Sequence, residues 1–400
     1  MKRAIVCGLL LLIITGLLSG CWSRRELNNI SIVVGLGLDK AGDQFKLTVQ
    51  IVNPGQVAVK KSSMSNASPV VTYEETGKTV PEALARMTVK APRRLYFAHL
   101  RMVIIGEDVA REGVGSPLDF LSRNMELRTD FFLVVARRVS ASEVLKMNSA
   151  MDPIPSNNMF TKLETSSKLW AATGSITLNR LIQELGTKGK SPTLTGIEIL
   201  GKRSQGDKLS NGQSVDPLVL LTYVGMAVFK EDRMVGWLEE NDIKALNYVQ
   251  NTVTQTTGTI SCPGGSGEIT MQAIRADSSI DVSMEKGVPL FDISIKIEQD
   301  IADVECDMDL SKSSAVSELK KISDAKLNEL VEASIRKVQK QFKTDIYGFG
   351  DVFHRKFPKA WHGIKTWDDE FMNAKFQVRS DTNIRRMGTT MQSIKHETRE

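Results

Sequence analysis

Cysteine and histidine are scarce in this sequence. Each occurs four times in 400 residues, and so few cysteines exclude the dense disulfide framework of small secreted domains. The four histidines do not have the i, i+4 spacing with which a helix holds zinc. We therefore expect neither a metal site nor a cofactor. The histidines are His99, His354, His362 and His396.

The common catalytic motifs are also missing. Gly264-Gly265-Ser266-Gly267 is not a nucleophile elbow, because Glu268 stands where the second glycine of that motif would be. Gly35-Leu36-Gly37 has no third glycine before a helix, so it is not a dinucleotide-binding turn. Asp368-Asp369-Glu370 are direct neighbours whose side chains diverge, which favours a solvated run over paired acid and base groups. We expect a protein that is not an enzyme.

The sequence also lacks a large excess of positive or negative charge. The 52 Lys and Arg against 47 Asp and Glu give a formal net charge of +5, too little to indicate a nucleic-acid-binding protein. No apolar run after Cys21 approaches the ~18 residues of a membrane-spanning helix. The 41% hydrophobic and 25% charged residues are ordinary for a globular protein.

The N-terminus carries the clearest pattern of the chain. Lys2 and Arg3 precede an almost unbroken apolar run at residues 4–18, and the small residues Ser19 and Gly20 lead to Cys21. At ~1.5 Å per residue the run spans roughly 22 Å as a helix, short of the ~30 Å hydrocarbon core of a bilayer. This order of parts is typical of an export signal.

Leu18-Ser19-Gly20-Cys21 resembles the lipobox of bacterial lipoproteins. The resemblance implies that residues 1–20 are removed and that Cys21 carries an S-diacylglycerol group and an N-acyl chain. Cys7 cannot take this role, because only a short basic and apolar stretch precedes it. The alternative is an uncleaved anchor with an incidental cysteine. Two or more acyl chains hold a protein stably on a membrane, so we expect the rest of the chain to lie at an extracytoplasmic membrane surface.

Cys262 and Cys306 are the two cysteines that remain after the leader. A bridge between them and two separate buried thiols both fit the sequence, because spacing along the chain says nothing about distance. We favour the two separate thiols.

Strand and helix patterns alternate over the first part of the chain. An apolar segment at 30–39 and an alternating segment at 45–51 predict a hairpin. The alternation of strands and helices predicts a mixed α/β fold here. Further strands are expected at 70–76, 99–105, 131–136 and 197–200. A helix is expected to open at 79–82, and others at about 117–128 and at 178–185.

The last portion has the pattern of an α+β domain. We expect a hairpin at 218–238, a helix at about 241–249, and strands at 254–261, 268–276, 291–297 and 374–378. Apolar residues at helical spacing predict a helix from about Ser314 to Thr344 that ends before Gly348 and covers an antiparallel sheet. Leu330 is expected in its buried stripe.

Polar and proline-rich stretches at 152–155 and 202–213 are the expected domain boundaries. The predicted organisation is a signal peptide at 1–20, an N-terminal mixed α/β domain at 21–150, a small middle domain and linker at 151–213, a C-terminal α+β domain at 214–388 and a polar tail at 389–400.

Several stretches, in this order, resemble the Ger(x)C family, the C subunit lipoproteins of bacterial spore germinant receptors. The N-terminal stretches are Cys21 to Asn28 with Ile32-Val33-Val34-Gly35-Leu36-Gly37-Leu38-Asp39, then Arg93-Arg94 with His99 to Glu107, and Arg123-Asn124-Met125-Glu126-Leu127-Arg128. The C-terminal stretches are Gln341, Asp345-Ile346-Tyr347-Gly348-Phe349-Gly350, Phe357-Pro358, Trp361 and Trp367.

The resemblance implies a three-domain mixed α/β lipoprotein on the outer face of the spore's inner membrane. It implies assembly with two membrane-spanning subunits, A and B, into a receptor that senses nutrients and triggers germination. It implies no catalytic residues and leaves open whether this subunit contacts the nutrient. Large side chains such as Tyr347, Phe349, Trp361 and Trp367 are then expected in the core.

Two other classes of protein share the anchor. A solute-binding lipoprotein of a membrane transporter would need two similar α/β lobes around a cleft, whereas the last part of this chain has an α+β pattern. An anchored envelope enzyme would need a nucleophile or metal-binding set of residues, and the sequence offers neither.

Overall fold

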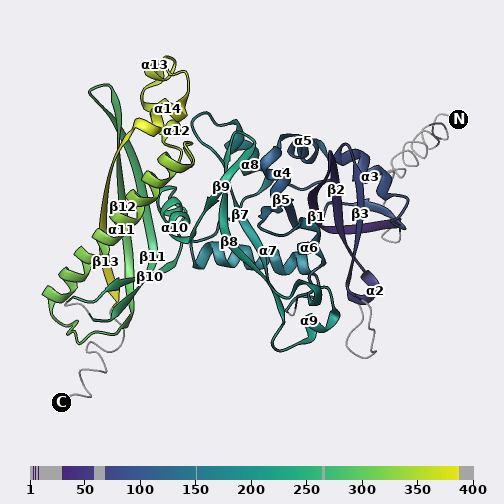
Figure 1. Ribbon diagram of the computed structural model, residues 1–400, viewed down its shortest axis with the longest axis horizontal. Coiled ribbons are helices and arrows are strands. Elements are labelled where there is room, and N and C mark those ends of the chain that lie inside the picture. Colours follow the sequence, from purple (N-terminus) through teal and green to yellow (C-terminus); the bar gives the residue numbers. More distant parts are fainter. Residues whose placement is uncertain are drawn as a thin grey trace.

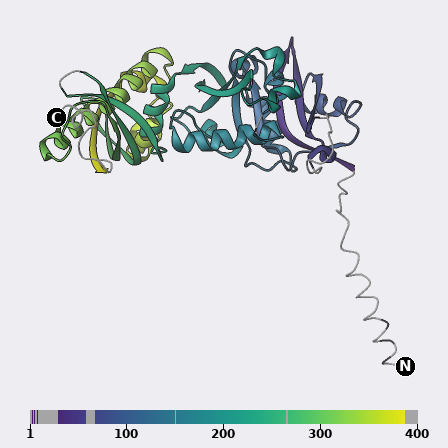
Figure 2. The same cartoon turned by 90° about the horizontal axis from the view of Figure 1, so that it is seen from below.

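The computed structural model describes residues 29–57, 68–149, 151–263 and 266–386, together with residues 3, 5 and 8. Cys21, most of the serine-rich loop at 60–69 and the polar tail lie outside the described residues. Two units, each built on one β-sheet, follow one another along the long axis (Figures 1 and 2). Within the described part, no helix has the length and apolar character needed to span a membrane.

The first unit is built on a nine-stranded sheet. Its order is β3-β2-β1-β5-β6-β7-β8-β9, with β4 paired to the start of β1. The bounds are Ile30–Ala41 (β1), Gln44–Val52 (β2), Val70–Gly77 (β3), Arg94–Tyr96 (β4), Met102–Gly106 (β5), Phe132–Ala136 (β6), Thr193–Gly201 (β7), Val219–Lys230 (β8) and Arg233–Leu238 (β9). The central strands β1, β5, β6 and β7 are parallel, and antiparallel pairs flank them.

Helices cover both faces of this sheet. One hydrophobic cluster joins the sheet to α3, α4, α5 and α8, and a second joins its other face to α6 and α7. The bounds are Pro54–Val57 (α2), Val80–Met87 (α3), Glu107–Glu112 (α4), Gly115–Arg123 (α5), Ala141–Lys146 (α6), Pro155–Leu169 (α7), Leu178–Gly186 (α8), Arg203–Gln205 (η2, a 3₁₀ turn) and Leu209–Gln213 (α9). The predicted hairpin of β1 and β2 and the doubly covered strand β6 are confirmed. The helix predicted to reach Arg128 ends at Arg123.

The hairpin of β8 and β9 forms where the sequence predicts it, but it belongs to the large sheet. Strand β8 is hydrogen-bonded to β7 along most of its length, so the polar stretch at 202–213 connects two neighbouring strands of one sheet. Residues 219–238 were expected in the C-terminal domain. The predicted domain boundaries stay a prediction, since backbone pairing alone does not define a domain.

The second unit has a four-stranded sheet in the order β10-β11-β12-β13. Its bounds are Thr256–Ser261 (β10), Glu268–Glu285 (β11), Val288–Val304 (β12) and Lys375–Arg386 (β13), with helices Glu240–Val249 (α10), Ser313–Gln341 (α11), Phe349–Lys356 (α12), Pro358–Trp361 (α13) and Trp367–Asn373 (α14). The predicted mixed fold with a long helix on this sheet is confirmed. One detail is corrected: β13 runs parallel to β12, because the chain returns to the sheet through α11 to α14, a helical crossover of the kind that joins parallel strands.

Helix α11 buries the face that its apolar spacing predicts. Leu319, Leu327, Ile335 and Val338 are all buried. Leu330, however, is only half-buried against the core. The helix ends at Gln341, and Gly348 instead precedes α12.

Truncating the centre of this face should destabilise the protein clearly. Ile335 is 1% exposed, so Ile335→Ala should lower the free energy of unfolding by ~2 to 5 kcal/mol through lost burial and the cavity left behind. Glu329→Ala, on the exposed side of the same helix, should change it by less than about 0.5 kcal/mol. Urea unfolding of both variants measures the difference. Equal small effects would mean that α11 does not form the core of the second unit.

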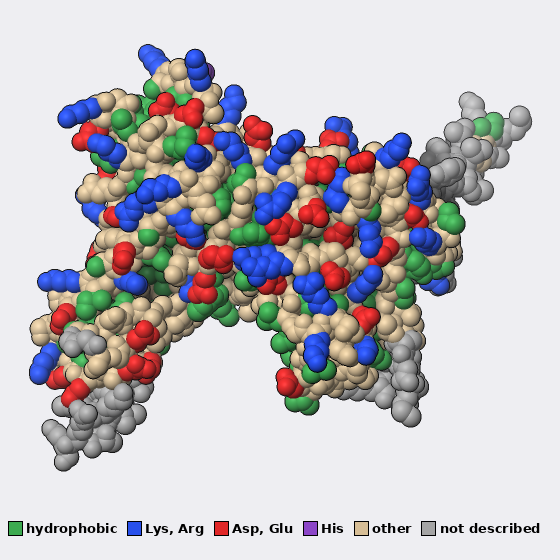
Figure 3. Space-filling view, viewed as in Figure 1, with side chains coloured by type: hydrophobic (Ala, Val, Ile, Leu, Met, Phe, Trp, Pro, Cys, Tyr) green, Lys and Arg blue, Asp and Glu red, His purple; other side chains and the backbone are tan. Residues whose placement is uncertain are grey.

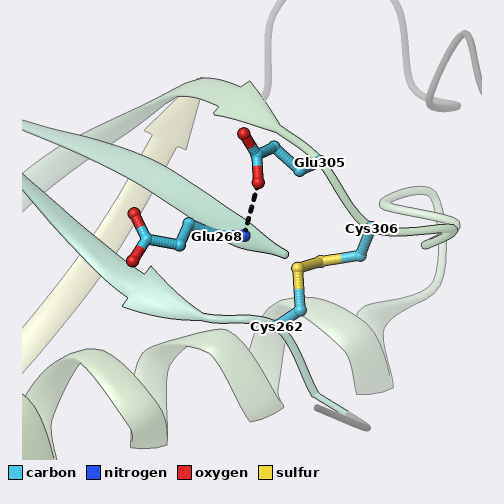
Figure 4. The surroundings of a disulfide bond; sticks show 4 residues. All are labelled: Cys262, Glu268, Glu305 and Cys306. Atoms are coloured by element: carbon cyan, nitrogen blue, oxygen red, sulfur yellow. Dashed lines mark hydrogen bonds between the residues drawn. A yellow bond between two sulfur atoms is a disulfide. The ribbon is translucent and has the colours of Figure 1, made fainter. Parts of the chain in front are cut away.

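Cys262 and Cys306 form a disulfide (Figure 4), which corrects the expectation of two separate thiols. Cys262 follows β10, Cys306 follows β12, and their Cα atoms are 6.0 Å apart. Beside the bridge the Glu268 backbone N–H donates to the Glu305 carboxylate at 3.0 Å (Figure 4). A bridge across a loop of 44 residues restricts the unfolded chain and stabilises the fold by about 4 kcal/mol on the loop-closure model.

Candidate functional site

The segment Asp345-Ile346-Tyr347-Gly348-Phe349-Gly350 surrounds a buried carboxylate. Asp345 is 1% exposed. Its Oδ1 accepts hydrogen bonds from the backbone N–H groups of Tyr347 and Gly348, both at 2.9 Å. Its Oδ2 accepts from the backbone N–H of Gly350 at 2.8 Å and from the indole Nε1–H of Trp367 at 2.9 Å. Four donors therefore hold the loop between α11 and α12 around one side chain.

The environment of Asp345 opposes ionisation despite these donors. Burial raises the pKa of its carboxyl to about 6, and the hydrogen bonds from Gly350, Trp367, Gly348 and Tyr347 act in the opposite direction. A carboxyl with a raised pKa is often an acid or base in an enzyme. Here all four donors belong to the surrounding loop and helix, and the side chain is closed off from solvent, so Asp345 organises structure.

Two glycines bring this loop against the first unit. A Cβ on Gly189 would lie 2.7 Å from the Cα of Gly350, and a Cβ on Gly350 would lie 2.5 Å from the Cα of Gly189. Gly189 also has φ +80°, a conformation that side chains disfavour. The contact of the two backbones therefore requires glycine at both positions.

Polar contacts around Asp345 fasten the two units together. The Ser191 N–H of the first unit donates to the Asp345 carbonyl at 2.6 Å, and within the second unit the Gln250 side chain donates to the Ile346 carbonyl at 2.8 Å. Thr344 donates its hydroxyl proton to Asp368 at 3.1 Å, so in the 2.7 Å pair with Thr344 the hydroxyl of Ser191 is the donor. This junction contains most of the C-terminal motif residues noted in the sequence.

Aromatic side chains of the same motif form the core behind the junction. Tyr347, Phe349 and Trp367 are buried, and Trp361 is half-buried. Phe349 lies 4.9 Å from Phe291 of β12, between ring centroids. The expectation that these side chains are core residues is confirmed for the three buried ones.

The N-terminal stretch Ile32 to Asp39 ends with a second buried carboxylate, that of Asp39. Asp39 accepts hydrogen bonds from the backbone N–H groups of Ala141 at 2.8 Å and Ser142 at 2.9 Å, at the start of α6. Burial raises its pKa above the usual range. A Cβ on Gly37 would lie 3.0 Å from Leu145 of the same helix. The glycines and the aspartate of β1 thus seat α6 on the sheet.

Two further motif stretches meet on the surface. The Arg94 guanidinium lies 2.5 Å from the Glu126 carboxylate, which joins the arginine pair at the start of β4 to the segment after α5. Both side chains are partly or largely exposed, so the ion pair contributes little stability. Charged side chains of both signs are mixed over the face shown in Figure 3, with no large area of one sign there.

The described residues contain no group of three or more His, Cys, Asp or Glu side chains arranged to hold a metal ion. His396 and Cys21 fall outside the described part. Sequence reasoning noted Asp345 only as part of a motif and missed Gly189 and Ser191. The sequence held one indication that Asp345 binds backbone N–H groups. Glycines follow it three and five residues later, at Gly348 and Gly350, and the carboxylate accepts hydrogen bonds from both.

Comparisons with known proteins find matches over both units of this chain. A family model described as "Spore germination protein N-terminal domain" matches residues 23–199, and one described as "Spore germination B3/ GerAC like, C-terminal" matches residues 224–388. Spore germination protein KC of Bacillus subtilis (strain 168) is 30% identical over 404 residues, which cover 99% of each chain. Spore germination protein B3 of the same organism is 26% identical over 93% of this chain and 95% of the relative.

Among solved structures, the crystal structure of the GerBC protein superposes with a TM-score of 0.53. It covers 88% of this chain and 96% of that chain at 21% identity, which shows a shared fold. The family models and the 30% identical relative identify the chain as a protein of the spore germination class. The chain belongs to the Ger(x)C family.

Proposed function

We propose that this chain is the membrane-anchored lipoprotein subunit of a nutrient germinant receptor. It assembles with membrane-spanning A and B subunits on the outer face of the spore's inner membrane, and the assembly triggers germination. The observation that carries the proposal is similarity over 99% of the chain to a spore germination protein. The subunit acts through the proteins it meets at the membrane and catalyses no reaction.

The anchor gives this subunit its place in the assembly. Cys21 carries the diacylglycerol and acyl groups, and nine residues further on the chain enters β1 at Ile30. So short a tether keeps the first unit close to the membrane surface, because a chain spans at most ~3.3 to 3.6 Å per residue. Tethering also raises the effective concentration of the subunit near membrane proteins without any new contact.

Replacing Cys21 by Ala removes the thiol that takes the lipid. We expect Cys21→Ala to accumulate as unprocessed precursor or to leave the membrane fraction, with the folded domains unchanged. Fractionation of sporulating cells with detection of the chain measures this. Cys7→Ala is the matched control, since it also removes a leader cysteine, and it should be processed and retained as the wild type is. A Cys21→Ala protein that is fully processed and membrane-bound would contradict the anchor.

A further inference from the structure

A groove opens on the helix-covered side of the second sheet. It lies between α10, α11 and the edge strand β10, where α11 leaves part of the sheet uncovered, and its volume is about 460 Å³. This volume is in the range of sites that hold small molecules, ~300 to 1,000 Å³. The groove is separate from the Asp345 junction, none of whose hydrogen-bonding residues lines it.

The floor of the groove is apolar and its rim is polar. The apolar lining comes from both the sheet and α11, while threonines of β10 and residues of α10 form the rim. The apolar residues that the sheet and α11 contribute are Ile260, Met271, Ala273, Ile297, Leu327 and Leu330. Leu330 follows the core spacing of α11 but is only half-buried. Its position in the lining of this groove explains that partial exposure.

A buried tyrosine lines the groove with its hydroxyl unpaired. Tyr248 is 6% exposed, and its hydroxyl makes no hydrogen bond to the described residues. The half-buried Tyr223 and the buried Tyr347 are paired instead: the Tyr223 hydroxyl donates to the Met159 carbonyl at 2.6 Å, and that of Tyr347 lies 2.8 Å from the Ser334 hydroxyl. The hydroxyl is not one of the fully enclosed polar atoms without a partner, so it is open to the groove and can donate a hydrogen bond to a ligand oxygen there.

Gln299 presents a second donor to the groove. It is 8% exposed, and its Oε1 accepts a hydrogen bond from Ser323 at 2.8 Å. Its amide nitrogen makes no hydrogen bond within the described part of the chain. Together with the Tyr248 hydroxyl, this leaves two donors without a protein partner among the described residues, both open to acceptor oxygens of a ligand.

The charged side chains favour an anionic group. Lys244 is already engaged: its ammonium lies 3.0 Å from Glu240 and 3.6 Å from the centre of the Trp170 ring. Lys326 is exposed, lines the groove and forms no ion pair with the described residues. The groove therefore offers one uncompensated positive charge beside two neutral donors.

From the unpaired Tyr248 hydroxyl, the unpaired Gln299 amide and the free Lys326 above an apolar floor, we propose that this groove binds a small molecule with an apolar body and a carboxylate. The apolar body packs on the sheet and α11, and the oxygens accept hydrogen bonds from Tyr248 and Gln299. The site belongs to this chain alone and needs neither the lipid anchor nor the membrane-spanning subunits.

Calorimetric titration of the full chain in lipid nanodiscs tests the site, with empty nanodiscs as the blank. The probes are 4-methylpentanoate, its amide and 3-methylbutylamine, which share a branched apolar body. The carboxylate should bind one to one with a dissociation constant below about 1 mM, the amide more weakly, and the amine not detectably. Absence of saturable binding by both the carboxylate and the amide would overturn the proposal.

Two variants locate the binding. Tyr248→Phe should weaken carboxylate binding by about fivefold to tenfold and leave the urea midpoint unchanged, because no protein hydrogen bond is lost. Tyr347→Phe is the matched control: it removes the pairing with Ser334, so it should lower the urea midpoint and leave binding unchanged. Lys326→Gln should weaken the carboxylate more than the amide. Binding that is unaffected by both Tyr248→Phe and Lys326→Gln lies elsewhere and would refute the assignment.

Discussion

Spores that lack this chain should lose the germination response to one class of nutrient. Under the proposed function the receptor cannot transmit its signal without this subunit, so its removal should abolish the response to that class and leave non-nutrient triggers intact. The measurement is the rate of germination of deletion spores against a panel of nutrients and one non-nutrient trigger, with any paralogous receptors removed.

Complementation separates loss of the subunit from indirect effects of the deletion. Restoring the wild-type gene should restore the response, and restoring the Cys21→Ala form should restore it only in part, since the fold is kept while the tether is lost. Deletion spores that answer every nutrient at the normal rate would refute the receptor assignment, whatever the state of the ligand groove.

Asp345→Asn should strongly destabilise the protein. The amide group puts an N–H donor at one of the two carboxylate oxygens, so two of the four donors around Asp345 lose their acceptor. Each buried unpaired donor costs ~1 to 3 kcal/mol, which predicts a loss of ~2 to 6 kcal/mol in the free energy of unfolding, measured in urea. Asp351→Asn, six residues on and paired with Arg355 near the surface, should change it by less than about 0.5 kcal/mol.

The effect should also depend on pH. The folded carboxyl of Asp345 has a pKa raised by burial to about 6, against 3.8 for the free side chain. Between these values the folded state binds more protons than the unfolded state, so raising the pH destabilises the wild type through this group. The gap in stability between wild type and Asp345→Asn should therefore shrink by up to ~3 kcal/mol from about pH 4 to above pH 6. A gap that widens over this range would contradict burial as the dominant influence.

Elements with clear periodicity were predictable from the sequence. Strand β2 has alternating side chains, β6 is a short run of apolar residues, and α11 repeats its buried side chains at helical spacing. In each case the burial of one face, or of both, leaves a direct trace in the residue order. Helix α7 left little trace, because its 15 residues bury few apolar side chains, chiefly Met159 and Leu163, and polar residues fill the rest.

Long-range relations were not predictable in the same way. The bridge of Cys262 to Cys306, the parallel pairing of β13 with β12 and the place of the β8–β9 hairpin each depend on how distant segments meet. The role of Asp345 follows from the direction of backbone N–H groups, which residue types do not reveal. The unpaired hydroxyl of Tyr248 is of the same kind, since the sequence shows a tyrosine and only the structure shows that no described residue pairs with it.

Purification of this chain from detergent-solubilised spore inner membrane tests the receptor assignment most directly. A tagged wild-type chain should bring down two membrane-spanning proteins, the A and B subunits, in constant ratio, as identified by mass spectrometry. The Cys7→Ala form should do the same, and an unrelated tagged lipoprotein from the same membrane should recover neither. Recovery of the chain alone, or with the permease of a transporter in place of the two subunits, would contradict its assignment as a germinant receptor subunit.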